Sequence, residues 1–88
     1  MFELGQLIVT PAAFELLQDE NISPDSVFER HALGDWDDMK ASDKDANYLA
    51  LDMGGRILSV YRLPSGEEIW VTTDPERVAT TILLPSEH

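Results

Sequence analysis

Aspartates gather in one part of this chain, with six of them between residues 35 and 52. Carboxylates at this density could hold a divalent cation, or they could attract Lys and Arg side chains of a partner protein. A calcium loop that began at Asp43 would need glycine at its sixth position, where this chain has Tyr48. We therefore predict no metal site and no cofactor. We predict instead a binding surface made by Asp35, Trp36, Asp37, Asp38, Asp43, Asp45 and Asp52.

The charge of the whole chain supports this choice of partner. Seventeen Asp and Glu residues stand against six Lys and Arg residues, which gives a formal net charge of −11. Nucleic-acid binding depends on cations that displace counterions from phosphates, so we expect no direct binding to nucleic acid or to an anionic membrane. We expect a basic protein surface as the partner. Solubility alone would also explain the acidic surface, and the sequence does not indicate an oligomeric state.

Trp36 has two interpretations. An aromatic residue in a polar loop either fills the seam between helices and sheet or anchors a partner, since Trp is enriched at binding hot spots. The sequence leaves both open.

An alternative catalytic set can be formed from His31, Tyr61 and Arg77. A small metal-independent ribonuclease would use His31 as general acid and base and Arg77 or Arg62 to hold the phosphate. His31 is equally explained as a helix-end residue bonded to a carbonyl or carboxylate. Hydroxyls on the predicted strands, such as Ser59, Thr73 and Thr80, are explained by strand propensity. We favour a non-enzymatic protein.

Local signals predict helices over residues 11–20, 24–32 and 43–53. Thr10 and Ser23 each precede a proline, which is a typical helix start. Ser42 with Asp45 resembles a capping box, and Gly54 is a typical stop. Residues Ala46, Leu49, Ala50 and Met53 fall at helical spacing and predict a buried stripe.

The period then changes, which predicts strands over residues 56–63, 68–73 and 77–84 in an antiparallel meander. Residues 4–9 are a candidate fourth strand. Trp70 is expected either beneath a helix or on the open sheet face. The prediction is therefore an α+β fold with two to three N-terminal helices before the sheet. Its expected core contains Phe14, Leu49, Ile57, Val60, Ile69, Val71, Val78 and Ile82.

With 88 residues the chain has room for a single domain, residues 1–88. It contains no cysteine, which excludes a disulfide scaffold and fits a cytoplasmic protein. The N-terminal segment has an acid where a signal peptide needs a basic region, and we expect no membrane span.

Two segments together, RHALGDWDD at residues 30–38 and LSVYRLPSGEEIWVTTDPERVATTILLP at residues 58–85, resemble a group of small uncharacterised bacterial proteins. Members of this group are carried on plasmids and integrative elements and bear labels such as "plasmid-related protein" or "restriction endonuclease subunit M". The resemblance implies no activity. It does suggest a mobile-element protein that inhibits a nucleic-acid-binding partner as a DNA mimic. The order of helices and strands is also similar to the barnase and RelE ribonuclease layout, which underlies the alternative above.

Overall fold

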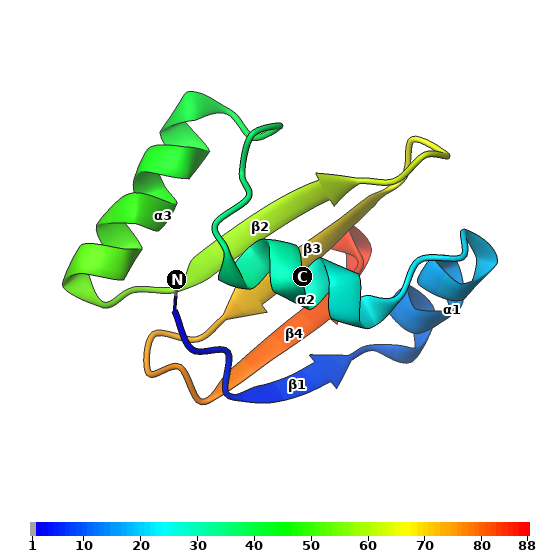
Figure 1. Ribbon diagram of the computed structural model, residues 1–88, viewed down its shortest axis with the longest axis horizontal. Helices are drawn as coiled ribbons and strands as arrows, with labels where there is room; N and C mark the ends of the chain where they lie inside the picture. Colours follow the sequence, from blue (N-terminus) through cyan, green and yellow to red (C-terminus); the bar gives the residue numbers. More distant parts are fainter. Residues whose placement is uncertain (1) are drawn as a thin grey trace.

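Four strands form one mixed sheet in the order β1-β4-β3-β2 (Figure 1). The computed structural model describes residues 2–88. The strands are β1 (Gln6–Val9), β2 (Ile57–Arg62), β3 (Glu68–Thr73) and β4 (Ala79–Leu83). The helices are α1 (Pro11–Asp19), α2 (Pro24–Ala32), α3 (Ala41–Met53) and a short 3₁₀ turn, η1 (Pro85–Glu87). Within the described residues, no helix combines the length and the apolar character that crossing a membrane requires.

The α+β class is confirmed, but the predicted antiparallel meander is wrong in one respect. Strands β2, β3 and β4 do pair antiparallel, whereas β1 pairs with β4 in parallel. The three α-helices lie between β1 and β2 in the chain, so they do not precede the whole sheet. Pairing between the two ends of the chain depends on tertiary contacts that a short apolar run does not encode.

Gly5 is the residue that lets β1 approach β4. Its φ of 67° lies in the left-handed region, and a Cβ placed on it would lie 2.2 Å from the carbonyl oxygen of Val78. The next residue, Gln6, donates its N–H to that same oxygen at 2.9 Å. A side chain at position 5 would therefore prevent the first hydrogen bond of the parallel pair.

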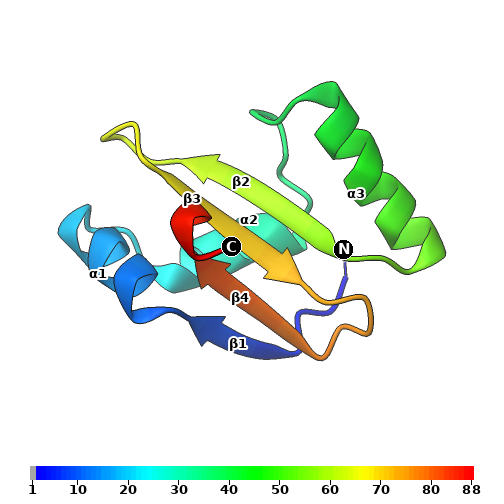
Figure 2. The same cartoon turned by 180° about the vertical axis from the view of Figure 1, so that it is seen from behind.

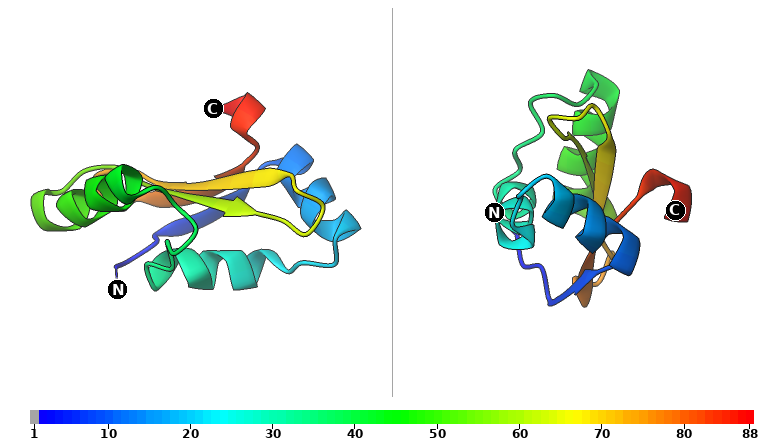
Figure 3. Two further views of the ribbon diagram at one scale, coloured as in Figure 1. Left: turned by 90° about the horizontal axis from the view of Figure 1, so that it is seen from above. Right: turned by 90° about the vertical axis from the view of Figure 1, so that its right-hand side faces the viewer.

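The two faces of the sheet differ in what covers them. Figure 3 shows α2 on one side of the sheet and η1 on the other, and Figure 2 shows η1 over the face opposite α2. The α2 side carries the fully buried strand residues, Ile57, Ser59, Tyr61, Ile69, Val71, Thr73, Thr80 and Ile82. Trp70 stands half-buried on the opposite face, where its ring meets the ring of His88 edge-on at 4.9 Å.

The helix starts follow their local signals in two cases out of three. The hydroxyl of Thr10 accepts the N–H of Ala13 at 3.2 Å, and that of Ser23 accepts the N–H of Asp25 at 3.2 Å. Helix α3 begins at Ala41 after Lys40, which makes no side-chain cap, so the capping box predicted at Ser42 is wrong. The stop at Gly54 is confirmed, with a left-handed φ of 74°.

The predicted core is partly wrong. Ile57, Ile69, Val71 and Ile82 are fully buried and Val60 is half-buried, whereas Phe14, Leu49 and Val78 are exposed. Helix α1 buries Ala13 and Leu17 in place of Phe14. Val78 lies in the turn before β4, where the left-handed φ of Arg77 has broken the strand alternation.

Helix α3 lies beside the edge strand β2, not over a sheet face, which is why Leu49 stays exposed (Figure 1). Its contact with that edge is apolar where Ala50 packs with Ile57, and polar at Asn47. The Asn47 side-chain amide donates to the carbonyl oxygen of Leu58 at 2.7 Å and accepts the N–H of the same residue at 3.1 Å. Asn47 thus occupies the place that a neighbouring strand would take, and it shields part of an edge open to pairing.

We expect Asn47→Ala to lower the free energy of unfolding by about 1–3 kcal/mol, because it removes both bonds and leaves backbone groups of Leu58 unpaired near the core. Urea denaturation followed by circular dichroism measures this loss. Ser42→Ala, at an exposed position of the same helix, is the control and should change stability little. An Asn47→Ala protein as stable as the wild type would contradict this role.

Candidate functional site

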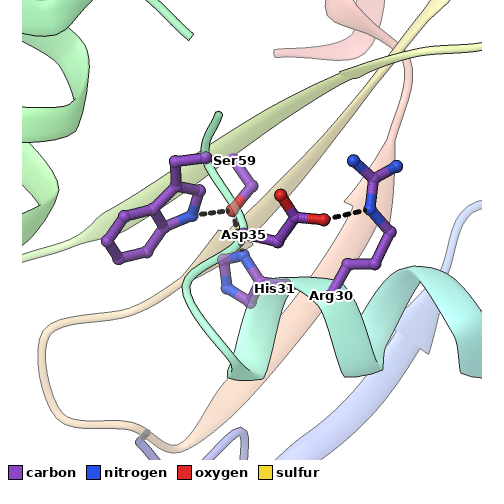
Figure 4. Close-up of polar contacts among 5 residues, drawn as sticks. Arg30, His31, Asp35 and Ser59 are labelled. Atoms are coloured by element: carbon purple, nitrogen blue, oxygen red, sulfur yellow. Dashed lines mark hydrogen bonds and ion pairs between the residues drawn. The ribbon is translucent and has the colours of Figure 1, made fainter. Parts of the chain in front are cut away.

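His31, the central residue of the alternative catalytic set, lies in the core between α2 and the sheet. It is 0% exposed, and both of its ring nitrogens have hydroxyl partners. Nδ1 lies 2.5 Å from Ser59 Oγ, and Nε2 lies 2.8 Å from Thr73 Oγ1 (Figure 4 shows His31 and Ser59). The sequence suggested a carbonyl or a carboxylate as the partner of His31, but both partners in these two contacts are hydroxyls.

The direction of every proton in this network follows from its ends. Thr80 donates to the carbonyl oxygen of Leu4 at 2.7 Å, so its hydroxyl must accept from Thr73. Thr73 therefore accepts from His31, which places the imidazole proton on Nε2. Nδ1 is then an acceptor and receives the proton of the Ser59 hydroxyl.

Trp36 completes the network at the other end. Its indole N–H donates to Ser59 Oγ at 2.6 Å, and its side chain is 1% exposed among Ala50 and Ile57. Of the two interpretations of Trp36, the structure thus supports the core residue. Trp36 contributes no side chain to the predicted binding surface.

The neutral form of His31 is the one that this site accepts. Burial, with a smaller contribution from the positive charge of Arg77, lowers the pKa of the imidazole to about 4 from the usual 6.5. A serine hydroxyl beside a histidine is the arrangement of an activated nucleophile. Here Ser59 and His31 are both fully buried, so a substrate has no contact with either side chain.

Tyr61 and Arg77 are held in structural roles as well. The Tyr61 ring is buried beneath the guanidinium of Arg30, at 4.2 Å, and burial raises the pKa of its phenol. Arg77 donates to the carbonyl oxygens of Gly55 at 2.7 Å and Ala50 at 3.2 Å, which fixes the end of α3 to the β3–β4 turn. The alternative catalytic set therefore offers no accessible acid, base or phosphate-binding cation.

The predicted acidic surface, by contrast, is accessible. We define the acidic surface as the carboxylates Asp37, Asp38, Asp43, Asp45 and Asp52, all of which are exposed. Asp35 is half-buried and pairs with Arg30 at 2.7 Å, so it belongs to the support of the loop (Figure 4). The segment from residue 35 to residue 53 contains six aspartates and two lysines, a net charge of −4.

None of these five carboxylates has an ion-pair partner within residues 2–88, where the two salt bridges are Arg30–Asp35 and Arg62–Glu68. No group of three or more His, Asp or Glu side chains in the same residues could hold a metal ion. The expectation that the protein uses no metal or cofactor stays a prediction. The exposed carboxylates can attract cations of a partner.

The sequence contains a signal for the buried network, which the interpretation by strand propensity leaves out. Strand alternation places Ser59, Thr73 and Thr80 among core residues, and a buried hydroxyl requires a hydrogen-bond partner. His31 was the one internal histidine available to supply it. Asn47, which holds α3 to β2, had no signal that we recognise.

Comparison of the chain with protein-family models, with curated proteins and with solved structures gives no match.

Proposed function

We propose that this chain is a non-enzymatic binding protein whose acidic surface docks on a basic, nucleic-acid-binding partner and acts there as a DNA mimic. The observation that carries this proposal is a set of exposed carboxylates on the loop before α3 and on α3 itself, none of which has an ion-pair partner among residues 2–88. Lys and Arg side chains that hold phosphates would find substitutes in these carboxylates.

The attachment of this segment supports the proposal. Trp36 ties the loop to the core, while Asn47 and Arg77 tie α3 to β2 and to the β3–β4 turn. The carboxylates therefore need little ordering when a partner binds, which reduces the entropic cost of association. The resemblance to mobile-element proteins agrees with a partner in a host defence system that acts on DNA.

The proposal predicts a loss of binding when the charge of the acidic surface is reversed. Asp37→Lys, Asp38→Lys and Asp45→Lys together should lower the association rate with the partner about tenfold or more and should flatten its salt dependence. Stability should hold, since exposed charges contribute little to it. Stopped-flow or surface-binding kinetics at several salt concentrations measures the effect.

A matched variant separates local charge from total charge. Glu15→Lys, Asp19→Lys and Glu29→Lys change the net charge by the same amount at exposed positions of α1 and α2. This variant should bind with a much smaller loss. Equal losses in the two variants would show that total charge decides binding, and that the acidic surface has no special role.

The partner can be obtained by affinity capture from the native host, with the wild-type chain and the two Lys variants as parallel baits. The captured protein is then tested for DNA binding with and without this chain. We expect competition, so that DNA is released as the chain is added, and we expect the chain alone to bind neither DNA nor RNA. A partner that binds DNA and this chain at the same time would contradict the DNA-mimic proposal.

A further inference from the structure

The outer face of α3 carries an apolar stripe that no part of the described chain covers. Leu49 is 62% exposed and Met53 is 76% exposed, and they lie one helical turn apart, next to the exposed Ala46. With Ala50 and the glycines at the end of the helix, these residues line a hollow of about 320 Å³. Single exposed apolar residues are ordinary, but a continuous stripe indicates a contact surface.

The spacing of the stripe is that of a core-facing helix. Residues 46, 49, 50 and 53 follow the pattern that predicts burial. Ala50 is buried with Trp36 and Ile57, whereas Ala46, Leu49 and Met53 stay exposed. Gly54 adds to the openness, because a Cβ built there would meet nothing within 4 Å. A partner that covers this side would complete the burial that the pattern indicates.

Charge decides which partner fits. Asp45 precedes Leu49 by four residues and Asp52 follows it by three, so both carboxylates border the stripe on the helix surface. Arg56 also lines the hollow. A second copy of the chain would bring the same aspartates, and another net charge of −11, against this border. A basic segment would be attracted to it.

We propose that the outer face of α3 is the apolar centre of the binding surface, and that it receives a basic amphipathic helix whose aliphatic side chains pack on Leu49 and Met53. This inference rests on the proposed function. In this arrangement Asp45 and Asp52 pair with Lys or Arg at the edge of the contact, while the apolar side chains supply most of the affinity.

A short amphipathic peptide of Leu and Lys is the probe, and a Ser/Lys peptide of equal charge is its control. We expect the Leu/Lys peptide, titrated into ¹⁵N-labelled protein at about 150 mM salt, to shift the amide resonances of Ala46, Leu49, Met53 and Gly54 most strongly. Leu49→Gln together with Met53→Gln should raise the dissociation constant of the peptide about tenfold or more, since each lost apolar contact weakens binding substantially. Gln keeps the helix propensity close to that of the wild type.

Leu33→Gln is the matched control, because Leu33 is also 62% exposed but lies at the end of α2. It should leave the dissociation constant unchanged. Equal affinity for the Ser/Lys peptide, or an unchanged affinity after Leu49→Gln with Met53→Gln, would overturn the inference. In both cases the proposed function is still tested separately, by whether the variant with Asp37→Lys, Asp38→Lys and Asp45→Lys loses the partner in affinity capture.

Sedimentation velocity at millimolar protein tests whether a second copy of the chain occupies the stripe instead. We expect a monomer. A dimer that dissociates in the Leu49→Gln, Met53→Gln variant would show that the stripe binds a second copy, and it would overturn the assignment to a basic partner.

Discussion

Replacing Trp36 by alanine should lower the free energy of unfolding by about 3–5 kcal/mol. The indole is 1% exposed, packs on Ala50 and Ile57, and meets the ring of Tyr48 edge-on at 5.3 Å. Its removal leaves a cavity between the loop and the sheet and takes away the N–H that Ser59 accepts. An 88-residue domain has roughly 4–13 kcal/mol of stability in total, so the loss is a large share of it. Urea denaturation measures it.

Two further variants show which part of the indole matters. Trp36→Phe keeps most of the apolar contact and loses the hydrogen bond to Ser59, so its loss should be clearly smaller. Trp70→Ala truncates a half-buried indole on the other sheet face and should also cost less. If Trp36→Ala were as stable as the wild type, the indole would not be held in the core, and its interpretation as a partner anchor would return.

The features that the sequence predicted correctly are those encoded by neighbours in the chain. Thr10 and Ser23 cap their helices through N–H groups two or three residues away, and Gly54 ends α3 by its own backbone angle. The strand alternation around Ile69 and Val71 is also confirmed, because successive side chains of a strand point to opposite faces. Each of these outcomes depends on a few adjacent residues.

Apart from the capping box at Ser42, the wrong predictions concern where an element or residue lies relative to the sheet. The stripe at Leu49 has core spacing, but α3 docks beside β2 through Asn47, and no local pattern indicates a helix beside an edge strand. Val78 keeps the strand period, but the turn at Arg77 shifts it out of β4. The parallel pairing of β1 needs close approach at Gly5, a contact between residues more than seventy positions apart.

The residues of the candidate site also divide into those that the sequence could place and those that it could not. Exposed aspartates such as Asp37 and Asp45 could be placed on the surface from composition and position alone, because a solvated charge needs no particular neighbour. His31 could not be placed, since its role depends on two hydroxyls, Ser59 and Thr73, that β2 and β3 bring to its ring nitrogens. Trp36 stayed open between two interpretations for the same reason, as its hydrogen-bond partner Ser59 lies on a strand 23 residues away.

Acidification should destabilise the protein by about 3 kcal/mol between pH 6.5 and pH 4 through His31 alone. The pKa of the buried imidazole is about 4, against 6.5 for the unfolded chain. In this window the unfolded chain binds a proton that the native protein does not, so stability falls as the pH falls. Below about pH 4 both states carry the proton and the loss ends.

The hydrogen-bond network explains why the site resists the proton. Protonated His31 would donate from both nitrogens, whereas Ser59 already accepts from Trp36 and directs its own proton at Nδ1. Ser59 would have to turn its hydroxyl proton away from Nδ1 and give up that hydrogen bond. Arg77 adds repulsion to the buried charge.

Other effects of pH also change the stability in this range. The prediction is therefore stated as the difference in free energy of unfolding between the wild type and a variant that lacks His31. Acidification toward the pI of about 4.2 reduces the self-repulsion of the net negative chain and opposes the effect of His31. His31→Gln keeps these other groups and lacks the titration, so the wild-type curve should fall relative to the variant curve by about 3 kcal/mol from pH 6.5 to pH 4. Urea midpoints across this range give both curves. An NMR titration of the His31 ring needs no variant: an imidazole that gains its proton near pH 6.5 would show that the buried network does not hold the neutral form.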